Sequence, residues 1–253
     1  MQRLLGDVRR ADERFSMIAP DSFVAVGLSG GKDSLALLSL LAAYRRIKPF
    51  RLCALTLVPK GRMDVQPLRL LCAALDVPYY TRESALFDEL FKQDGQSAAR
   101  KSPCALCARV RRGALVRMAK EHGCDTLALG HHLDDALATL LMAVLREGRF
   151  HTLAPKAVMG RENVTVIRPL ILTRESALSS FCSNHGLIPV KNPCPADGHT
   201  MRAEMTGLLR ELEAHYKDAA LKMTGALLKQ DFFMGADAQE PPQNEDGAEE
   251  LKG

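Results

Sequence analysis

The segment from Ser29 to Ser34 contains residue types that can hold a phosphate group. It reads Ser-Gly-Gly-Lys-Asp-Ser and stands between the apolar run FVAVGL and a stretch with apolar residues at helical spacing. Gly30 and Gly31 permit the sharp turn that offers unpaired backbone N–H groups to an anion. Lys32 adds a positive charge. The segment, which we call the glycine loop, therefore predicts a phosphate site between a strand and a helix.

The glycine loop differs from the common phosphate-binding sequence G-x-x-x-x-G-K-[ST] at two positions. Val26 stands where that sequence has glycine, and Asp33 stands where it has Ser or Thr. A tight turn capped by Ser29 or Asp33 would also use glycines here. The complete string, in its strand–turn–helix context, favours the phosphate site over the capped turn.

A second group of polar residues follows another apolar run. Gly130 lies at the carboxyl end of a predicted strand, and His131, His132, Asp134 and Asp135 open the next predicted helix. Open α/β sheets bind their ligands at this edge. The two aspartates could instead only cap the helix, because acidic side chains stabilise a helix N-terminus. The residues alone leave both interpretations open.

The elements that would position these residues alternate between strands and helices. Short apolar runs predict strands, and the stretches between them carry apolar residues at helical spacing. This alternation indicates an α/β fold with a parallel sheet, helices on both faces and a C-terminal helical extension. The predicted strands are 23–28, 50–58, 77–81, 125–131 and 164–170, and the predicted helices are 33–46, 64–75, 104–122, 134–147, 174–185 and 200–230.

Composition argues against contact with a membrane. Hydrophobic residues make up 47% of the 253 residues. Charged residues interrupt every apolar run before it reaches the ~20 residues of a membrane span. The N-terminal sequence MQRLLGDVRRADERF is charged and lacks the features of a secretory signal. We therefore expect a cytoplasmic protein.

Charge is distributed unevenly along the chain. The net charge is +4, yet residues 231–253 contain seven acidic residues and one lysine. This segment has few apolar residues and no periodicity, which predicts an acidic disordered tail. The basic remainder favours a polyanionic partner, with nucleic acid as the leading candidate. We divide the chain into an N-terminal helix (1–20), one main domain (21–230) and the tail.

Three of the seven cysteines stand where they could serve chemistry rather than packing. Cys104 and Cys107 follow Pro103 in the opening turns of a predicted helix, share one helix face and lie where the helix N-terminus favours thiolates. This pair is compatible with a redox pair, half a zinc site or chance. Cys194 lies between two prolines in a non-helical turn. Core packing is the expected role of the other four, Cys53, Cys72, Cys124 and Cys182.

Taken in order, the motifs SGGKDS, CALCARVRRG, LALGHHLDD, VIRPL and NPC resemble those of the PP-loop family of ATP pyrophosphatases, and in particular its tRNA 2-thiocytidine synthetase group. The resemblance extends roughly from residue 20 to residue 230. It implies that ATP is split to AMP and pyrophosphate and that Asp33 shares a Mg²⁺ ion with the phosphates. It also implies that Asp134 or Asp135 assists the Mg²⁺ or the chemistry. The implied ATP-binding residues are Ser29, Gly30, Gly31, Lys32, Asp33, Ser34, Gly130 and His131.

The same resemblance implies a [4Fe–4S] cluster on Cys104, Cys107 and Cys194, with one iron left open. Three cysteines in this arrangement complete no four-ligand zinc pattern, whereas cysteine thiolates do hold iron–sulfur clusters. Members of the group often have a second C-x-x-C at the last site, where this chain has Asp197. If Asp197 or His199 supplies a fourth ligand, zinc remains the alternative.

Basic residues accompany the cysteine pair. Seven lysines and arginines, and no acidic residue, occur from Arg100 to Lys120. They form either a solvated helix face or contacts to RNA phosphates. Arg111, one turn after Cys107, could instead point into the site and polarise the target base.

The resemblance also implies a reaction. We expect a [4Fe–4S]-dependent sulfurtransferase that uses ATP to adenylate a tRNA base carbonyl, at C2 of cytidine, and replaces its oxygen with sulfur. The expected partners are a single-stranded tRNA loop, sulfide or a sulfur-donor protein, and a second copy of the chain in a homodimer. Three alternatives remain open: a zinc-containing PP-loop adenylating ligase or amidotransferase, a non-catalytic nucleotide- or RNA-binding module, and thiolation of another base or of a small molecule.

Overall fold

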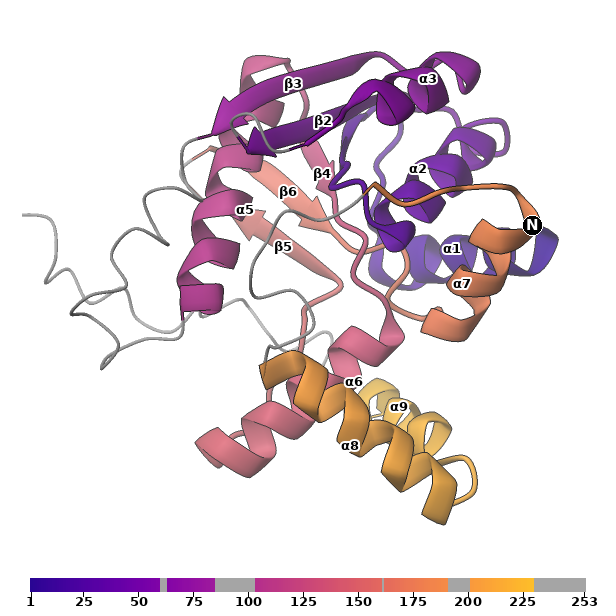
Figure 1. Cartoon of the computed structure of the whole chain (residues 1–253), viewed down its shortest axis with the longest axis vertical. Helices are drawn as coiled ribbons and strands as arrows, with labels where there is room; N and C mark the ends of the chain where they lie inside the picture. The colour runs from indigo at the N-terminus through magenta and orange to yellow at the C-terminus, as the bar shows by residue number, and fades with distance from the viewer. Residues whose placement is uncertain (60–62, 85–102, 161, 191–200, 230–253) are drawn as a thin grey trace, which may run out of the picture.

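The computed structural model describes residues 1–59, 63–84, 103–160, 162–190 and 201–229 (Figure 1). Cys194, Asp197, His199 and the predicted tail lie outside these residues, as does the side chain of Cys104. In the described part of the chain, no helix has the length and hydropathy that crossing a membrane requires.

A six-stranded sheet forms the centre of the fold (Figure 1). Its strand order is β3-β2-β1-β4-β6-β5, and every neighbouring pair is parallel except β6 and β5. The predicted parallel sheet is thus confirmed, with one antiparallel edge strand added. The strands are β1 (Phe23–Gly27), β2 (Arg51–Pro59), β3 (Tyr79–Ser84), β4 (Thr126–Ala128), β5 (Lys156–Met159) and β6 (Val164–Ile167).

Helices cover both faces of this sheet, as predicted. The helices of the described ranges are α1 (Gln2–Phe15), α2 (Lys32–Tyr44), α3 (Gln66–Ala74), α5 (Pro103–Glu121), α6 (Leu133–Met142), α7 (Glu175–Asn184), α8 (Met201–His215) and α9 (Ala219–Lys229). Successive residues of β1 show the two layers. Val24 and Val26 pack in one core cluster with Leu41 of α2, whereas Ala25 packs in a second cluster with Val116 of α5.

The C-terminal extension consists of two helices rather than one. Helices α8 and α9 lie beside α6, apart from the layers that cover the sheet (Figure 1). The sequence predicted one helical stretch over 200–230, but Asp218 has a positive φ of 61° and the chain turns between His215 and Ala219. A residue in the left-handed region ends an α-helix.

Three element boundaries differ from the prediction in ways that matter for the site. β4 ends at Ala128 and β6 at Ile167, so that Gly130, His131 and Arg168 lie in loops beyond the strands. After Met142, α6 continues as a π-helical turn over Ala143–Glu147. The sequence missed β5 because this edge strand has only four residues, of which none is fully buried.

Candidate nucleotide site

The glycine loop follows β1 and leads directly into α2. Gly30 adopts a positive φ of 85°, and a Cβ atom there would lie 2.9 Å from the Met63 side chain, so glycine suits this position. Gly31 is the N-cap residue of α2, and no side chain caps this helix. The structure therefore lacks the cap by Ser29 or Asp33 that the alternative interpretation required. An uncapped helix N-terminus can bind an anion.

The side chains of the glycine loop are arranged around the start of α2. The hydroxyl of Ser34 donates to the carbonyl of Gly31 at 2.8 Å, and its oxygen lies 3.2 Å from that of Ser29. Lys32 Nζ lies 2.9 Å from Asp33 Oδ1 and 2.8 Å from Glu175 Oε1. Burial disfavours the charged lysine, but its hydrogen bonds to these two carboxylates outweigh burial and raise the pKa of Lys32. Lys32 is thus a cation that two carboxylates already share.

Gly130 brings the loop between β4 and α6 against the glycine loop. A Cβ atom on Gly130 would lie 3.1 Å from the carbonyl carbon of Asp33 and 3.1 Å from the backbone nitrogen of Ser34. The obstacle is backbone, which cannot rotate away as a side chain can. A side chain at this position would therefore displace the start of α2.

Gly130→Ala is expected to weaken ATP binding about tenfold, because the methyl group would push the glycine loop out of its position. Titration calorimetry with ATP measures the effect. Gly207→Ala in α8 is the matched control, since nothing lies within 4 Å of a Cβ atom there. Wild-type ATP affinity in folded Gly130→Ala protein would contradict this packing argument.

His132 connects the glycine loop with the start of α6. Its backbone N–H donates to Asp135 Oδ2 at 3.0 Å in a capping box. Its Nε2 atom lies 3.4 Å from Asp135 Oδ2 and 3.9 Å from Asp33 Oδ2. The histidine side chain is buried, whereas the carboxylates of Asp33 and Asp135 remain partly exposed. The structure thus brings these two predicted site residues together around one imidazole.

Two electrostatic effects act on the residues next to this imidazole. Burial favours the neutral form of Asp135, but His132, His131 and Arg202 outweigh burial and lower its pKa. Burial, followed by the charge of Arg168, lowers the pKa of His131 to about 3. At neutral pH, Asp135 is therefore a carboxylate and His131 is uncharged. The Nδ1 atom of His131 is buried and has no hydrogen-bond partner in the described residues.

Asp33 and Asp135 have the chemistry to hold Mg²⁺ together with a nucleotide. No group of three or more His, Cys, Asp or Glu side chains in the described ranges is arranged to hold a metal by itself. Mg²⁺ typically takes one or two protein carboxylates and completes its shell with phosphate oxygens and water. Two partly exposed carboxylates near an uncapped helix N-terminus fit that pattern.

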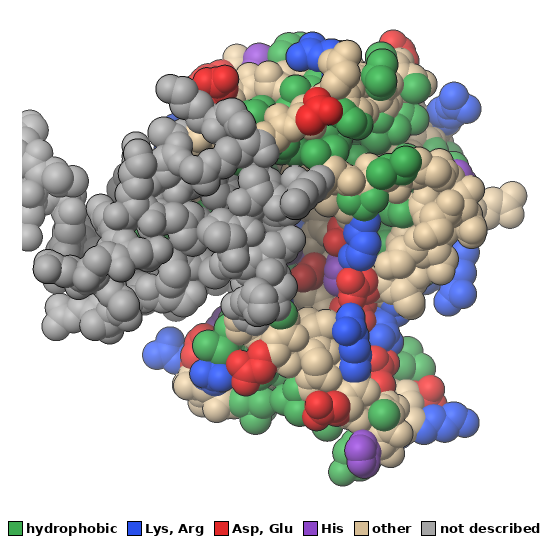
Figure 2. Space-filling model, in the orientation of Figure 1, with side chains coloured by type: hydrophobic (Ala, Val, Ile, Leu, Met, Phe, Trp, Pro, Cys, Tyr) green, Lys and Arg blue, Asp and Glu red, His purple; other side chains and the backbone are tan. Residues whose placement is uncertain are grey.

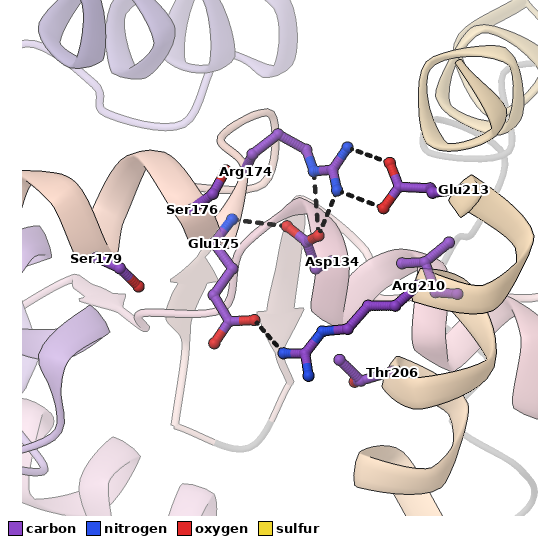
Figure 3. A pocket seen from close by; sticks show the side chains of 9 residues that line it. Asp134, Arg174, Glu175, Ser176, Ser179, Thr206, Arg210 and Glu213 are labelled. Atoms are coloured by element: carbon purple, nitrogen blue, oxygen red, sulfur yellow. Dashed lines mark hydrogen bonds and ion pairs between the residues drawn. The ribbon is translucent and has the colours of Figure 1, made fainter. Parts of the chain in front are cut away.

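Asp134 is placed differently from its neighbour. Its Oδ1 atom lies 3.0 Å from Arg174, and its Oδ2 atom accepts the backbone N–H of Glu175 at 2.7 Å (Figure 3). Arg174 also makes two hydrogen bonds of 2.8 Å to Glu213 of α8. Both oxygens of Asp134 are therefore engaged in fixing the start of α7. Sequence reasoning treated Asp134 and Asp135 as equivalent. In the structure both lie within 4 Å of the His132 ring, but Asp134 alone is held by Arg174 and by the N–H of Glu175.

Helix α8 approaches this site through charged side chains. Arg210 lies 3.6 Å from Glu175, which in turn holds Lys32. Arg210 and Glu175 are among the residues that border a cavity of about 240 Å³ between α7 and α8 (Figure 3). Figure 2 shows basic and acidic side chains alternating along the line where the sheet layers meet the C-terminal helices. No sequence motif pointed to Arg174, Glu175, Arg210 or Glu213.

A family model covers most of these segments: the PP-loop domain matches residues 6–206. The chain belongs to the PP-loop family. The match includes the glycine loop and the β4–α6 loop, and it ends within α8, before Arg210 and Glu213.

Curated relatives and a solved structure agree with membership of the PP-loop family. The chain is 35% identical over 221 residues to a tRNA-cytidine(32) 2-sulfurtransferase of Geobacter metallireducens, covering 84% of this chain and 83% of that protein. It is 35% identical over 231 residues to the protein of the same name from Pelobacter propionicus, covering 87% and 84%. The U34-tRNA thiolase NcsA of Methanococcus maripaludis, solved with its [4Fe–4S] cluster, has 25% identity and a TM-score of 0.72, covering 90% of this chain and 78% of that one.

In this PP-loop chain, α5 carries the predicted cysteine pair toward the nucleotide site. Helix α5 leads into β4, so its first residues lie at the sheet edge where β1 and β4 end. Cys107 is buried, at 7% exposure, and Arg111 follows one turn later on the same helix. Cys104 belongs to the first turn of α5, and Cys194 falls outside the described residues.

The remaining four cysteines have the predicted packing role. Cys53, Cys72, Cys124 and Cys182 are all free and buried. Burial raises the pKa of Cys72 to about 11, so this side chain is a neutral thiol at physiological pH. The expectation that these four residues are core residues is confirmed.

Proposed function

We propose that the chain is an ATP-dependent, [4Fe–4S]-dependent tRNA sulfurtransferase that replaces the oxygen at C2 of a cytidine with sulfur. One observation carries the proposal. An uncapped glycine loop and Asp135 flank His132 in a chain that is 35% identical to tRNA-cytidine(32) 2-sulfurtransferases. The resemblance to a tRNA thiolase with a [4Fe–4S] cluster supports the same reaction class.

The glycine loop would hold the part of ATP that leaves as pyrophosphate. Backbone N–H groups at the start of α2, the hydroxyls of Ser29 and Ser34, and the charge of Lys32 are donors suited to its oxygens. Gly130 packs against the backbone of Asp33 and Ser34, and His131 follows it in the same loop, so that both would contact the nucleotide. A Mg²⁺ ion on Asp33 and Asp135, when bound, would neutralise the charge that develops on the phosphates.

The chemistry divides into activation and replacement. The O2 atom of cytosine attacks the α-phosphorus of ATP, and the bond to pyrophosphate breaks. The loop donors and Lys32 stabilise the departing pyrophosphate. Sulfur then forms a bond to C2, and the former O2 leaves as an oxygen of AMP. The exchange needs no net oxidation or reduction when the sulfur is at the level of sulfide.

Cys104, Cys107 and Cys194 would hold the cluster. The burial of Cys107 at the edge of the sheet that contains the nucleotide site fits a buried thiolate ligand. The cluster, when bound, would supply the sulfur for C2. Arg111 would then act on the target base from the same helix.

The proposal includes the surroundings of the reaction. A single-stranded tRNA loop is the substrate, sulfide or a donor protein supplies sulfur, and the enzyme works in the cytoplasm as a homodimer. The division into an N-terminal helix (1–20), a main domain (21–230) and an acidic tail (231–253) belongs to the same proposal. Helix α1 packs with α2 in one core cluster, so the N-terminal helix is joined to the main domain.

Asp33→Asn is expected to reduce AMP formation by about a hundredfold or more, because the variant loses a carboxylate ligand for Mg²⁺ beside the phosphates. The iron content should stay at the wild-type level. The assay combines anaerobically purified protein with ATP, sulfide and tRNA, measures AMP, and identifies modified nucleosides by mass spectrometry. Wild-type protein that binds ATP but forms no AMP with any tRNA would reject the proposed function, and a thiolated base other than cytidine would replace its substrate.

A further inference from the structure

Arg168 lies next to the nucleotide site, although the sequence analysis gave it no role beyond its place in the VIRPL motif. Ile167 pairs with Ala128 in the parallel register of β6 and β4, and the N–H of Leu129 donates to the carbonyl of Ile167 at 2.9 Å. Arg168 and the segment that leads to His131 therefore leave neighbouring strands at the same edge of the sheet.

The guanidinium of Arg168 is buried and makes no ion pair within the part of the chain that the structure describes. Arg168 is 4% exposed, its Nη1 group donates to the carbonyl of Ala154, and its Nε group has no hydrogen-bond partner in the described residues. No carboxylate within the described ranges lies within 4 Å of it. A buried charge normally has an ionic partner, because leaving one unpaired is costly. This arrangement indicates that Arg168 is built to meet an anion from outside the chain.

The charges of two further arginines, Arg112 and Arg202, act on the guanidinium of Arg168. We call the three residues the arginine cluster. Arg202 of α8 lies 3.7 Å from Asp135 Oδ1. Burial, and then the charges of Arg112 and Arg202, lower the pKa of Arg168 to about 10. Asp135 is the acidic residue that offsets these charges. Among the described residues, the charges of Arg168 and Arg202 thus have one neighbouring carboxylate, that of Asp135.

The position of the arginine cluster narrows the choice of anion. Asp33 and Asp135 both approach the Nε2 atom of His132, and Arg202 approaches the other carboxylate oxygen of Asp135. The arginine cluster therefore adjoins the site at Asp135, whereas the glycine loop adjoins it at Asp33. Arginine is suited to phosphate oxygens because its planar fork can donate two hydrogen bonds at once.

We propose that the arginine cluster, with Arg168 at its centre, binds a phosphate ester at the point where ATP and the RNA meet. This inference rests on the proposed function. Two phosphate esters occur there: the α-phosphate of ATP, which stays on the activated base, and the phosphodiester beside the target nucleotide. The Nδ1 atom of His131 is also buried without a hydrogen-bond partner in the described residues, so it is available for a hydrogen bond to the same ligand.

The test compares Arg168→Gln and Arg202→Gln with wild type in two separate titrations, one with ATP alone and one with a tRNA stem-loop alone. Arg168→Gln is expected to raise one of the two dissociation constants about tenfold or more and to leave the other within about twofold. Weaker ATP binding identifies the α-phosphate, and weaker RNA binding identifies the phosphodiester. Arg202→Gln should weaken the same ligand, and it keeps the test usable if Arg168→Gln does not fold.

The matched control is Arg149→Gln, an exposed arginine without a side-chain partner in the described structure. Unchanged binding of both ligands in folded Arg168→Gln and Arg202→Gln protein would overturn the inference, as would an equal loss in Arg149→Gln. Thiolation by the wild-type protein is measured in the same preparation. If the wild type thiolates tRNA while the variants bind normally, the arginine inference fails and the proposed function stands. If the wild type does not thiolate, the function fails independently of the binding comparison.

Discussion

Asp135→Asn is expected to lower the rate of AMP formation by about a hundredfold, whereas Asp134→Asn is expected to act mainly on stability. Asp135 has a partly exposed carboxylate near Asp33, and asparagine at this position can still accept the His132 N–H that completes the capping box. The variant therefore loses the negative charge but keeps the local fold. The measurement is the AMP produced from ATP and tRNA, with the unfolding temperature recorded for each protein.

Asp134→Asn serves as the neighbouring control. The amide oxygen can still accept the Glu175 N–H, but the ion pair with Arg174 is lost. We expect a loss of about 1–3 kcal/mol in the free energy of unfolding and AMP formation within about threefold of wild type below the unfolding temperature. The reverse pattern, with catalysis lost in Asp134→Asn and retained in Asp135→Asn, would reject the separation of roles.

Cys107→Ser is expected to remove nearly all iron from the protein and to abolish thiolation, because a serine hydroxyl does not replace a thiolate on iron. ATP binding should persist, since the glycine loop and Asp135 do not include this cysteine. Iron, acid-labile sulfide and zinc are assayed together in anaerobically purified protein, alongside the visible spectrum. Cys194→Ser should give the same result.

Cys72→Ser is the matched control for this experiment. Cys72 is also buried, but it lies on α3 and not among the proposed ligands. Its replacement is expected to lower stability while leaving iron and thiolation unchanged. Zinc without iron in the wild-type protein would replace the sulfurtransferase with a PP-loop adenylating ligase. Iron retained in Cys107→Ser would remove this residue from the ligand set.

The parts of the site that sequence could predict are those formed by contiguous residues. The glycine loop needs glycines, a cation and a helix N-terminus within six positions, and all of them are visible in the segment Ser29–Ser34. The loop at Gly130 could be predicted for the same reason, because its residues are also contiguous in the sequence. Local backbone geometry decides both, because each connects a buried strand to a helix at the edge where ligands bind.

The ion pairs around the site could not be read from sequence, because they depend on how distant helices pack. Arg174 joins Asp134 to Glu213, and Glu175 joins Lys32 to Arg210. One signal was available: Glu175 opens the helix predicted after the strand over 164–170, and that position lies at the carboxyl edge of a parallel sheet. The ion pair of Glu175 with Lys32, however, is visible only in the tertiary structure.

The attachment of α8 to the nucleotide site has a consequence for synthesis of the protein. A ribosome that has reached the end of α7 has already made the glycine loop and both aspartates, but not Glu213 or Arg210. Until α8 leaves the exit tunnel, Arg174 and Glu175 lack these partners. A nascent chain therefore acquires the ion pairs of Arg174 and Glu175 with α8 only late in translation, after the sheet and its covering helices have been made.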